Sequence, residues 1–144
     1  MSMNLQDLAY KLNTHSTHTG VSFAANLSDD LETMEVVCST NTDASIFVVV
    51  SDQQILAVTP LFALEDIKEE QRDELNRTLL ALSPVIPLSS IGLQENNYVL
   101  FGAMPISTKF ENIAHELEVQ ADNTTDVLVA LESYFEQIEL TSEV

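Results

Sequence analysis

A strong excess of acidic residues constrains this chain more than any other feature. It carries 23 Asp and Glu against five Lys and Arg in 144 residues, which gives a net charge of −18. Yet 45% of the residues are hydrophobic, whereas a disordered acidic tail would be poor in them. We therefore expect a folded domain whose well-packed interior holds together a negative exterior that repels itself.

The length and the single cysteine limit the architecture further. A chain of 144 residues has the size of one domain, so we expect a single domain over residues 1–144. Cys38 is the only cysteine and excludes an internal disulfide, which suits a cytoplasmic protein. No segment resembles a signal peptide or approaches the roughly 20 apolar residues that span a bilayer. We expect no direct insertion into a membrane.

The first 60 residues predict one helix and then a meander of short strands. Leu5, Leu8 and Leu12 recur at helical spacing behind Asn4, a candidate N-cap residue. The run at residues 46–50 is β-branched, aromatic and continuous, which is typical of a central strand covered on both faces. The expected elements are a helix at residues 4–14 and strands at residues 21–27, 31–39, 46–50 and 55–59, with turns at residues 28–30, 41–43 and 51–54.

The second part of the chain returns to helical periodicity on either side of a hairpin. Ile67, Leu75 and Leu79 lie on one face of a surface helix, which Pro84 stops. The pattern over residues 107–139 is helical again, and cap residues in its middle leave open one long helix or two. The order α-β-β-β-(β)-α-β-β-α predicts an α+β fold with a mostly antiparallel sheet packed by helices. The remaining elements are a helix at residues 65–82 and strands at residues 88–93 and 98–104, with a turn at residues 95–97.

The residues that could carry chemistry do not form a specific motif. His15 and His18 could bind a metal from one helical face, but no third ligand is near them in sequence, so a polar connector is the favoured interpretation. His115 precedes Glu116 but lacks the second histidine of a zinc-protease helix. Cys38 alternates with apolar neighbours, and we expect a buried, inert thiol. We therefore predict no catalytic residue, no metal site and no cofactor.

The composition also disfavours nucleotide and nucleic-acid binding. The three glycines are not clustered, so the chain has no glycine-rich phosphate loop. Five scattered basic residues and the absence of Trp argue against nucleic acid as a partner. An acidic protein could instead mimic DNA, and that hypothesis predicts carboxylates in two rows at phosphate spacing.

One apolar stripe near the C-terminus is wide for a single helix. It either packs on the sheet as core or forms, in part, a dimer interface or a groove for a partner segment. Both interpretations stay open at this point. The candidate partner or dimer face consists of Val127, Leu128, Leu131, Tyr134, Phe135 and Ile138.

Five short segments carry a family pattern. They are Leu5-Gln-Asp-Leu-Ala, Val85-Ile-Pro-Leu-Ser-Ser-Ile-Gly-Leu, Tyr98-Val-Leu-Phe-Gly-Ala-Met, His115-Glu-Leu-Glu-Val and Ala121-Asp-Asn-Thr. These segments resemble the YjfI-like family of small bacterial proteins, which has no established activity, and the resemblance covers nearly the whole chain. It implies no site residues. Because genes of this family lie beside those for a PspA-like coiled-coil membrane-stress protein, the resemblance implies a protein partner in that context.

The order of elements also resembles that of type III secretion chaperones. Those are small, acidic, homodimeric α/β proteins that hold an extended segment of a client. The resemblance concerns the fold, so it implies a chaperone-like module and a homodimer without marking any residue.

These observations lead to a first hypothesis of a cytoplasmic, non-enzymatic binding module. It would be a homodimer that presents apolar patches framed by carboxylates to a protein partner, such as a basic or amphipathic segment. The alternative is a small-ligand binder or an enzyme whose site is assembled from residues distant in sequence, with Cys38, Tyr98 and His115 as candidates. The DNA mimic ranks last.

Overall fold

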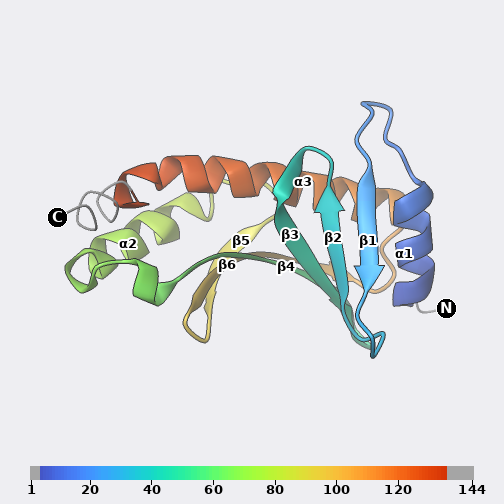
Figure 1. The fold of residues 1–144 in the computed structure, drawn as a ribbon, viewed down its shortest axis with the longest axis horizontal. Coiled ribbons are helices and arrows are strands. Elements are labelled where there is room, and N and C mark those ends of the chain that lie inside the picture. Colours follow the sequence, from blue (N-terminus) through green and yellow to red (C-terminus); the bar gives the residue numbers. More distant parts are fainter. Residues whose placement is uncertain (1–3, 136–144) are drawn as a thin grey trace.

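Six strands form one sheet in the order β1-β2-β3-β4-β6-β5, in a computed structural model that describes residues 4–135 (Figure 1). Every pair of neighbouring strands is antiparallel. The predicted α+β fold with an antiparallel sheet is therefore confirmed. The strands are β1 (Phe23–Leu27), β2 (Met34–Cys38), β3 (Asn41–Val50), β4 (Gln54–Ala63), β5 (Ser90–Gln94) and β6 (Asn97–Pro105), and the helices are α1 (Leu5–Thr14), α2 (Arg72–Leu82) and α3 (Phe110–Ala130).

The helices α1 and α3 pack against one face of this sheet and divide the interior into two clusters. α1 lies beside β1 at one end of the molecule, and α3 runs along the long axis toward α2 at the other end (Figure 1). The first core lies between the sheet, α1 and the start of α3, and its largest fully buried members are Leu8, Leu12, Met34, Ile46, Ile55, Ile113 and Leu117. The second core joins α2, the end of α3 and the β5–β6 hairpin through Ile67, Leu75, Leu79, Tyr98, Leu100, Val127, Leu131 and Tyr134.

The helix α1 also closes one edge of the sheet. Its expected N-cap is confirmed, because the Asn4 side chain accepts a hydrogen bond from the backbone N–H of Asp7 at 2.8 Å. Near its other end, Asn13 donates from Nδ2 to the carbonyl of Ala25 at 2.9 Å and accepts at Oδ1 from the N–H of Ala25 at 2.7 Å. One side-chain amide thus occupies both backbone groups of a residue in the edge strand β1, which protects that edge from pairing with another chain.

Three of the expected boundaries between strands and turns are wrong. The strand expected to end at residue 59 continues as β4 to Ala63, with an irregularity in its pairing between Pro60 and Phe62. β2 begins only at Met34, because Leu31 has a φ of 62° and belongs to the turn that precedes the strand. The predicted turn at residues 41–43 lies inside β3, because the chain already reverses at Ser39 and Thr40. β3 is therefore longer than the apolar run that predicted it.

The helix expected over residues 65–82 is shorter and begins later. Its first part consists of two separate 3-10 turns, Leu64–Asp66 and Glu69–Gln71, and α2 begins at Arg72. Ile67, between the two turns, has an extended backbone, and its carbonyl accepts a hydrogen bond from Nε of Arg72 at 3.1 Å. The Arg72 side chain thus binds the carbonyl of Ile67, which in a continuous helix would accept a hydrogen bond from a backbone N–H.

The helix α3 runs without interruption through the segment of cap residues at 122–125. The Asn123 side chain does not cap a second helix, because it is buried and its Nδ2 donates to the carbonyl of Pro87 at 2.7 Å. The end of the expected helical segment, beyond residue 135, lies outside the described residues. No helix within residues 4–135, not even the 21-residue α3, has the combination of length and apolar character that crossing a membrane requires.

Candidate functional site

The face of the sheet opposite α1 and α3 is open, and its side chains form rows across the strands. The pairing register places Glu35 beside Phe47, Phe47 beside Val58, and Val58 beside Phe101. Residues paired directly across antiparallel strands point to the same side of a sheet, so these four side chains form one row across β2, β3, β4 and β6. A shorter row, which consists of Val49, Leu56 and Ala103, runs alongside it. Together the two rows form the open face, which consists of Glu35, Phe47, Val49, Leu56, Val58, Phe101 and Ala103.

Solvent reaches the apolar side chains of the open face. Phe47 is 36% exposed and Val49 is 38% exposed, whereas Ile46 and Val48 of the same strand are buried in the first core. The expectation that residues 46–50 form a strand covered on both faces is therefore wrong. The sequence did not distinguish the two faces because both are equally apolar. Aromatic and aliphatic side chains that share an exposed surface are typical of interaction sites.

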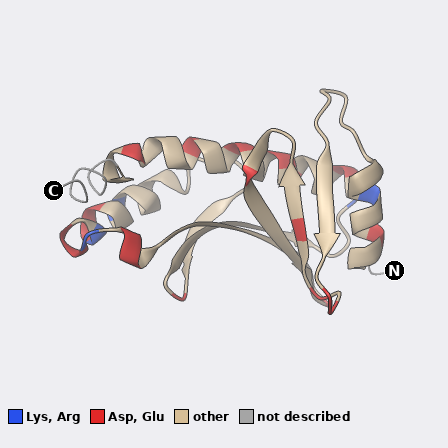
Figure 2. Cartoon of the chain, in the orientation of Figure 1, with Lys and Arg blue, Asp and Glu red and all other residues tan. Residues whose placement is uncertain are grey.

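The negative charge lies almost entirely outside the sheet. Glu35 and Asp43 are the acidic residues of the six strands, and these strands contain no Lys or Arg. The other acidic residues of the described chain lie on helices and connections, including several along α3 (Figure 2). The open face is consequently an apolar surface of low charge on a strongly negative protein, which favours cationic or amphipathic partners and repels acidic ones.

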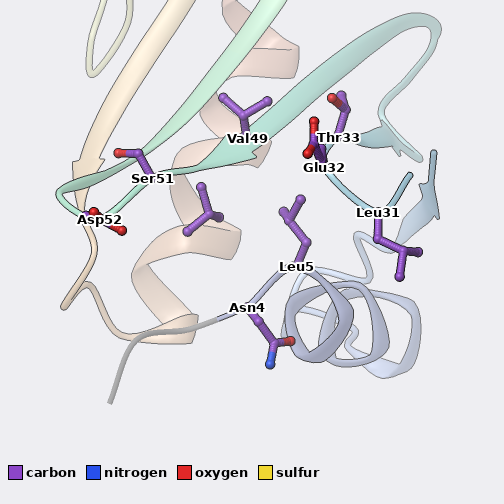
Figure 3. Close-up of a pocket in the computed structure, with 9 residues that line it drawn as sticks. Asn4, Leu5, Leu31, Glu32, Thr33, Val49, Ser51 and Asp52 are labelled. Carbon is purple, nitrogen blue, oxygen red and sulfur yellow. The ribbon is translucent and has the colours of Figure 1, made fainter. Parts of the chain in front are cut away.

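An open hollow of about 610 Å³ adjoins one end of the open face (Figure 3). It lies between the first turn of α1, the turn before β2 and the β3–β4 turn, and Val49 belongs both to its lining and to the open face. Leu5 and Leu31 add apolar surface to this hollow, and Glu32 and Asp52 add carboxylates. A segment that crosses the open face can therefore continue into the hollow, where a Lys or Arg side chain would meet acidic groups.

The stripe predicted as a partner or dimer face is divided between interior and surface. Val127, Leu131 and Tyr134 are buried in the second core of the single chain. The partner or dimer role of the stripe stays a prediction. The remaining positions are Leu128 and Phe135, which are half-buried, and Ile138, which lies outside the described residues.

The three histidines meet at one pocket of about 290 Å³. His15 and His18 come from the connector after α1, and His115 comes from α3 together with Glu111 and Glu118. The connector interpretation missed this arrangement because His115 lies far away in the sequence. Within residues 4–135, however, no three His, Cys, Asp or Glu side chains are placed so that they could hold a metal ion together.

The three candidates for a site built from distant segments lie in different parts of the molecule. Cys38 is buried in the first core, where its Sγ lies 3.2 Å from Oγ1 of Thr40. Tyr98 is buried in the second core and donates to Oδ1 of Asn76, and burial raises the pKa of Tyr98 above its usual value. His115 is exposed on α3 and lines a different pocket from Tyr98. These residues do not form a nucleophile with a neighbouring base.

The sequence matches the model of a bacterial protein family. The model is described as "Uncharacterized protein conserved in bacteria (DUF2170)" and matches residues 2–135. Two relatives, from Escherichia coli strain K12 and Escherichia coli O157:H7, are both described as "Uncharacterized protein YjfI". Each is 30% identical over 96 residues, which cover 64% of this chain and 71% of the relative. The predicted kinship with YjfI-like proteins is therefore confirmed.

Two solved structures have similar chains. A chain of the HopA1–SchA chaperone–effector complex superposes with a TM-score of 0.55 over 92% of this chain and 90% of its own length, at 15% sequence identity. A chain of the ExsC–ExsE complex superposes with a TM-score of 0.44 over 85% of this chain and 92% of its own length, at 13% identity. At 15% identity the first likeness concerns the fold alone, and for the fold the predicted similarity to type III secretion chaperones is confirmed.

Proposed function

This chain belongs to the DUF2170 family of bacterial proteins, and from that premise we propose that it is a non-enzymatic, chaperone-like module that binds a segment of another protein. The observation that carries the proposal is the open face, an apolar sheet surface of low charge on a protein whose net charge is −18. The similarity in fold to a chain of a chaperone–effector complex supports it.

The partner segment would combine apolar side chains with flanking Lys or Arg. An extended segment places alternate side chains on one side, which matches the cross-strand rows of Phe47, Val58 and Phe101. Its basic residues would face the surrounding carboxylates, including Glu32 and Asp52 in the hollow. Apolar contact supplies most of the affinity in such an arrangement, and the charges increase the rate of association and select the partner.

Three finer statements belong to the same proposal. The module acts in the cytoplasm, as the single cysteine suggests. It is a homodimer, which the similarity in the order of elements to type III secretion chaperones implies. Its partner acts with a PspA-like membrane-stress protein, which is what the kinship with YjfI-like proteins implies.

The competing functions have less support. A small-ligand binder or an enzyme needs reactive groups that converge on a pocket, and Cys38, Tyr98 and His115 lie apart. The hypothesis of a DNA mimic does not use the apolar open face at all.

Site-specific photo-crosslinking in the native bacterium tests the proposal. A photoreactive amino acid is placed at Phe47 on the open face or at Tyr10, which is 72% exposed on α1 and serves as the control. We expect position 47 to give a discrete adduct with one other protein and position 10 to give none, because only the open face contacts the segment.

Three results would contradict this proposal. They are no adduct at either position, equal adducts at both, and an adduct at position 47 that consists of two copies of this chain. The last result would assign the open face to self-association.

A further inference from the structure

One row of side chains crosses the open side of the sheet through all six strands. The pairing register extends the longer row of the open face at both ends, because Asn26 of β1 is paired with Glu35 and Ser90 of β5 is paired with Phe101. Directly paired residues of an antiparallel sheet have their Cβ atoms about 4.5–5.5 Å apart, so each side chain can contact its neighbours in the row. The complete row is Asn26, Glu35, Phe47, Val58, Phe101 and Ser90.

Glu35 places a carboxylate in this row without a basic neighbour. Its side chain is half-buried, and the two residues paired with it, Asn26 and Phe47, are uncharged. The described strands contain no Lys or Arg, so no side chain of the sheet neutralises this carboxylate. Partial removal of a carboxylate from water costs free energy unless a cation or hydrogen-bond donors face it. A cationic group from another molecule would offset that cost.

Phe47 supplies an accessible aromatic surface beside the carboxylate. It is 36% exposed, and the ring pairs found within residues 4–135 do not include it. The other aromatic residue of the row, Phe101, is placed differently. A Cβ atom on Gly92 would lie only 3.0 Å from Cε1 of Phe101, which shows that this ring lies over the backbone of β5. Phe47 is therefore the ring of the row that a ligand can cover most readily.

An aromatic ring next to a carboxylate suits arginine better than lysine. The guanidinium group is planar, so it can stack on the ring of Phe47 while it donates two parallel hydrogen bonds to the carboxylate of Glu35. The amide oxygen of Asn26, on the other side of Glu35, can accept a further hydrogen bond. The ammonium group of lysine is a compact, strongly hydrated charge and lacks this planar fork. The row therefore distinguishes between the two basic side chains.

We propose that Asn26, Glu35 and Phe47 form an arginine site, which selects partner segments that carry an arginine and an apolar side chain on the same side. This inference rests on the proposed function, because the arginine belongs to the segment that crosses the open face. Val58 and Phe101 continue the row and contact the apolar side chain. The arginine thereby fixes the direction in which the segment lies across the sheet. The site is distinct from the hollow, whose carboxylates belong to connections and not to strands.

Peptide selection on the full chain tests this proposal with a defined probe. A library of random short peptides displayed on phage is selected in parallel on the unmodified protein, on Glu35→Gln and on Asp43→Asn. Both substitutions remove one negative charge from a strand, but Asp43 lies outside the open face. We expect the unmodified protein and Asp43→Asn to enrich apolar peptides that contain arginine about five times more often than lysine. Glu35→Gln should retain the enrichment of apolar peptides and lose the preference for arginine.

Titration calorimetry with one selected peptide separates the roles of the carboxylate and the ring. Glu35→Gln is expected to raise the dissociation constant about 20-fold, because the guanidinium loses its charge-assisted hydrogen bonds, whereas Asp43→Asn should change it by no more than about twofold. Phe47→Leu keeps an apolar side chain but removes the aromatic face. We expect this variant to bind the peptide and its arginine-to-lysine analogue with nearly equal affinity. Circular dichroism verifies that each variant is folded.

Three results would overturn the arginine site while the open face remained a binding surface. They are apolar peptides enriched without a preference for arginine over lysine, an arginine preference that persists in Glu35→Gln, and an equal loss of that preference in Asp43→Asn. The last result would assign the preference to net charge. If no apolar peptide is enriched on the unmodified protein, the proposed function itself fails, and the arginine site fails with it.

Discussion

Replacing Phe47 and Val49 together with aspartate is expected to abolish partner binding while the domain stays folded. Both side chains lie on the open face and are more than one-third exposed, so the substitution leaves the first core intact. Two carboxylates would replace apolar contacts at the centre of the proposed surface and would have to be desolvated by the bound segment. We expect the affinity for the protein captured by crosslinking to fall by at least about 100-fold.

Titration calorimetry with the purified partner measures this change. Tyr10→Asp and Val129→Asp, combined in one control variant, add the same charge at exposed positions on α1 and α3. The control should bind with nearly unchanged affinity, because it alters the overall charge equally and leaves the open face untouched. Comparable losses in both variants would mean that net charge, and not the open face, determines binding.

Replacing Leu131 with alanine is expected to have the largest effect on stability. Leu131 is fully buried at the end of α3 and packs in the second core with α2 and the β5–β6 hairpin. We expect the free energy of unfolding to fall by about 3 kcal/mol, from lost apolar burial and the cavity left behind. For the neighbouring Leu128, which is half-buried, the same substitution should cost less than about 1 kcal/mol.

Urea denaturation followed by circular dichroism measures both values. The difference between the two leucines tests how the α3 stripe is divided between interior and surface. If Leu128→Ala cost as much as Leu131→Ala, then Leu128 would also be part of the packed interior. If Leu131→Ala cost almost nothing, the second core would contribute little to the stability of the domain.

The element order and the fold class were predictable because they depend on local periodicity. Leu5, Leu8 and Leu12 mark α1 by their spacing, and the buried face of β2 alternates as a strand should. Boundaries were less predictable where a side chain competes with the backbone. The Arg72 guanidinium binds the carbonyl of Ile67, and the expected helix therefore begins only at Arg72.

The candidate site was harder to predict because it depends on which surfaces other elements cover. The run at residues 46–50 is apolar on both faces, so periodicity could not show that Phe47 and Val49 lack a covering layer. The apolar stripe predicted as a partner or dimer face was difficult to interpret for the opposite reason, because another element covers part of it. Its periodicity identified one apolar face, but α2 covers part of it through contacts between residues far apart in the sequence, as in the hydrogen bond between the hydroxyls of Thr78 and Tyr134.

Methyl NMR during titration with the partner that crosslinking identifies tests directly whether the open face contacts this partner. We expect chemical-shift changes at the methyl groups of Val49, Leu56 and Val58 on the open face, with little change at Leu128 and Val129 on α3. Changes confined to α3, with the open-face methyl groups unaffected, would contradict this contact.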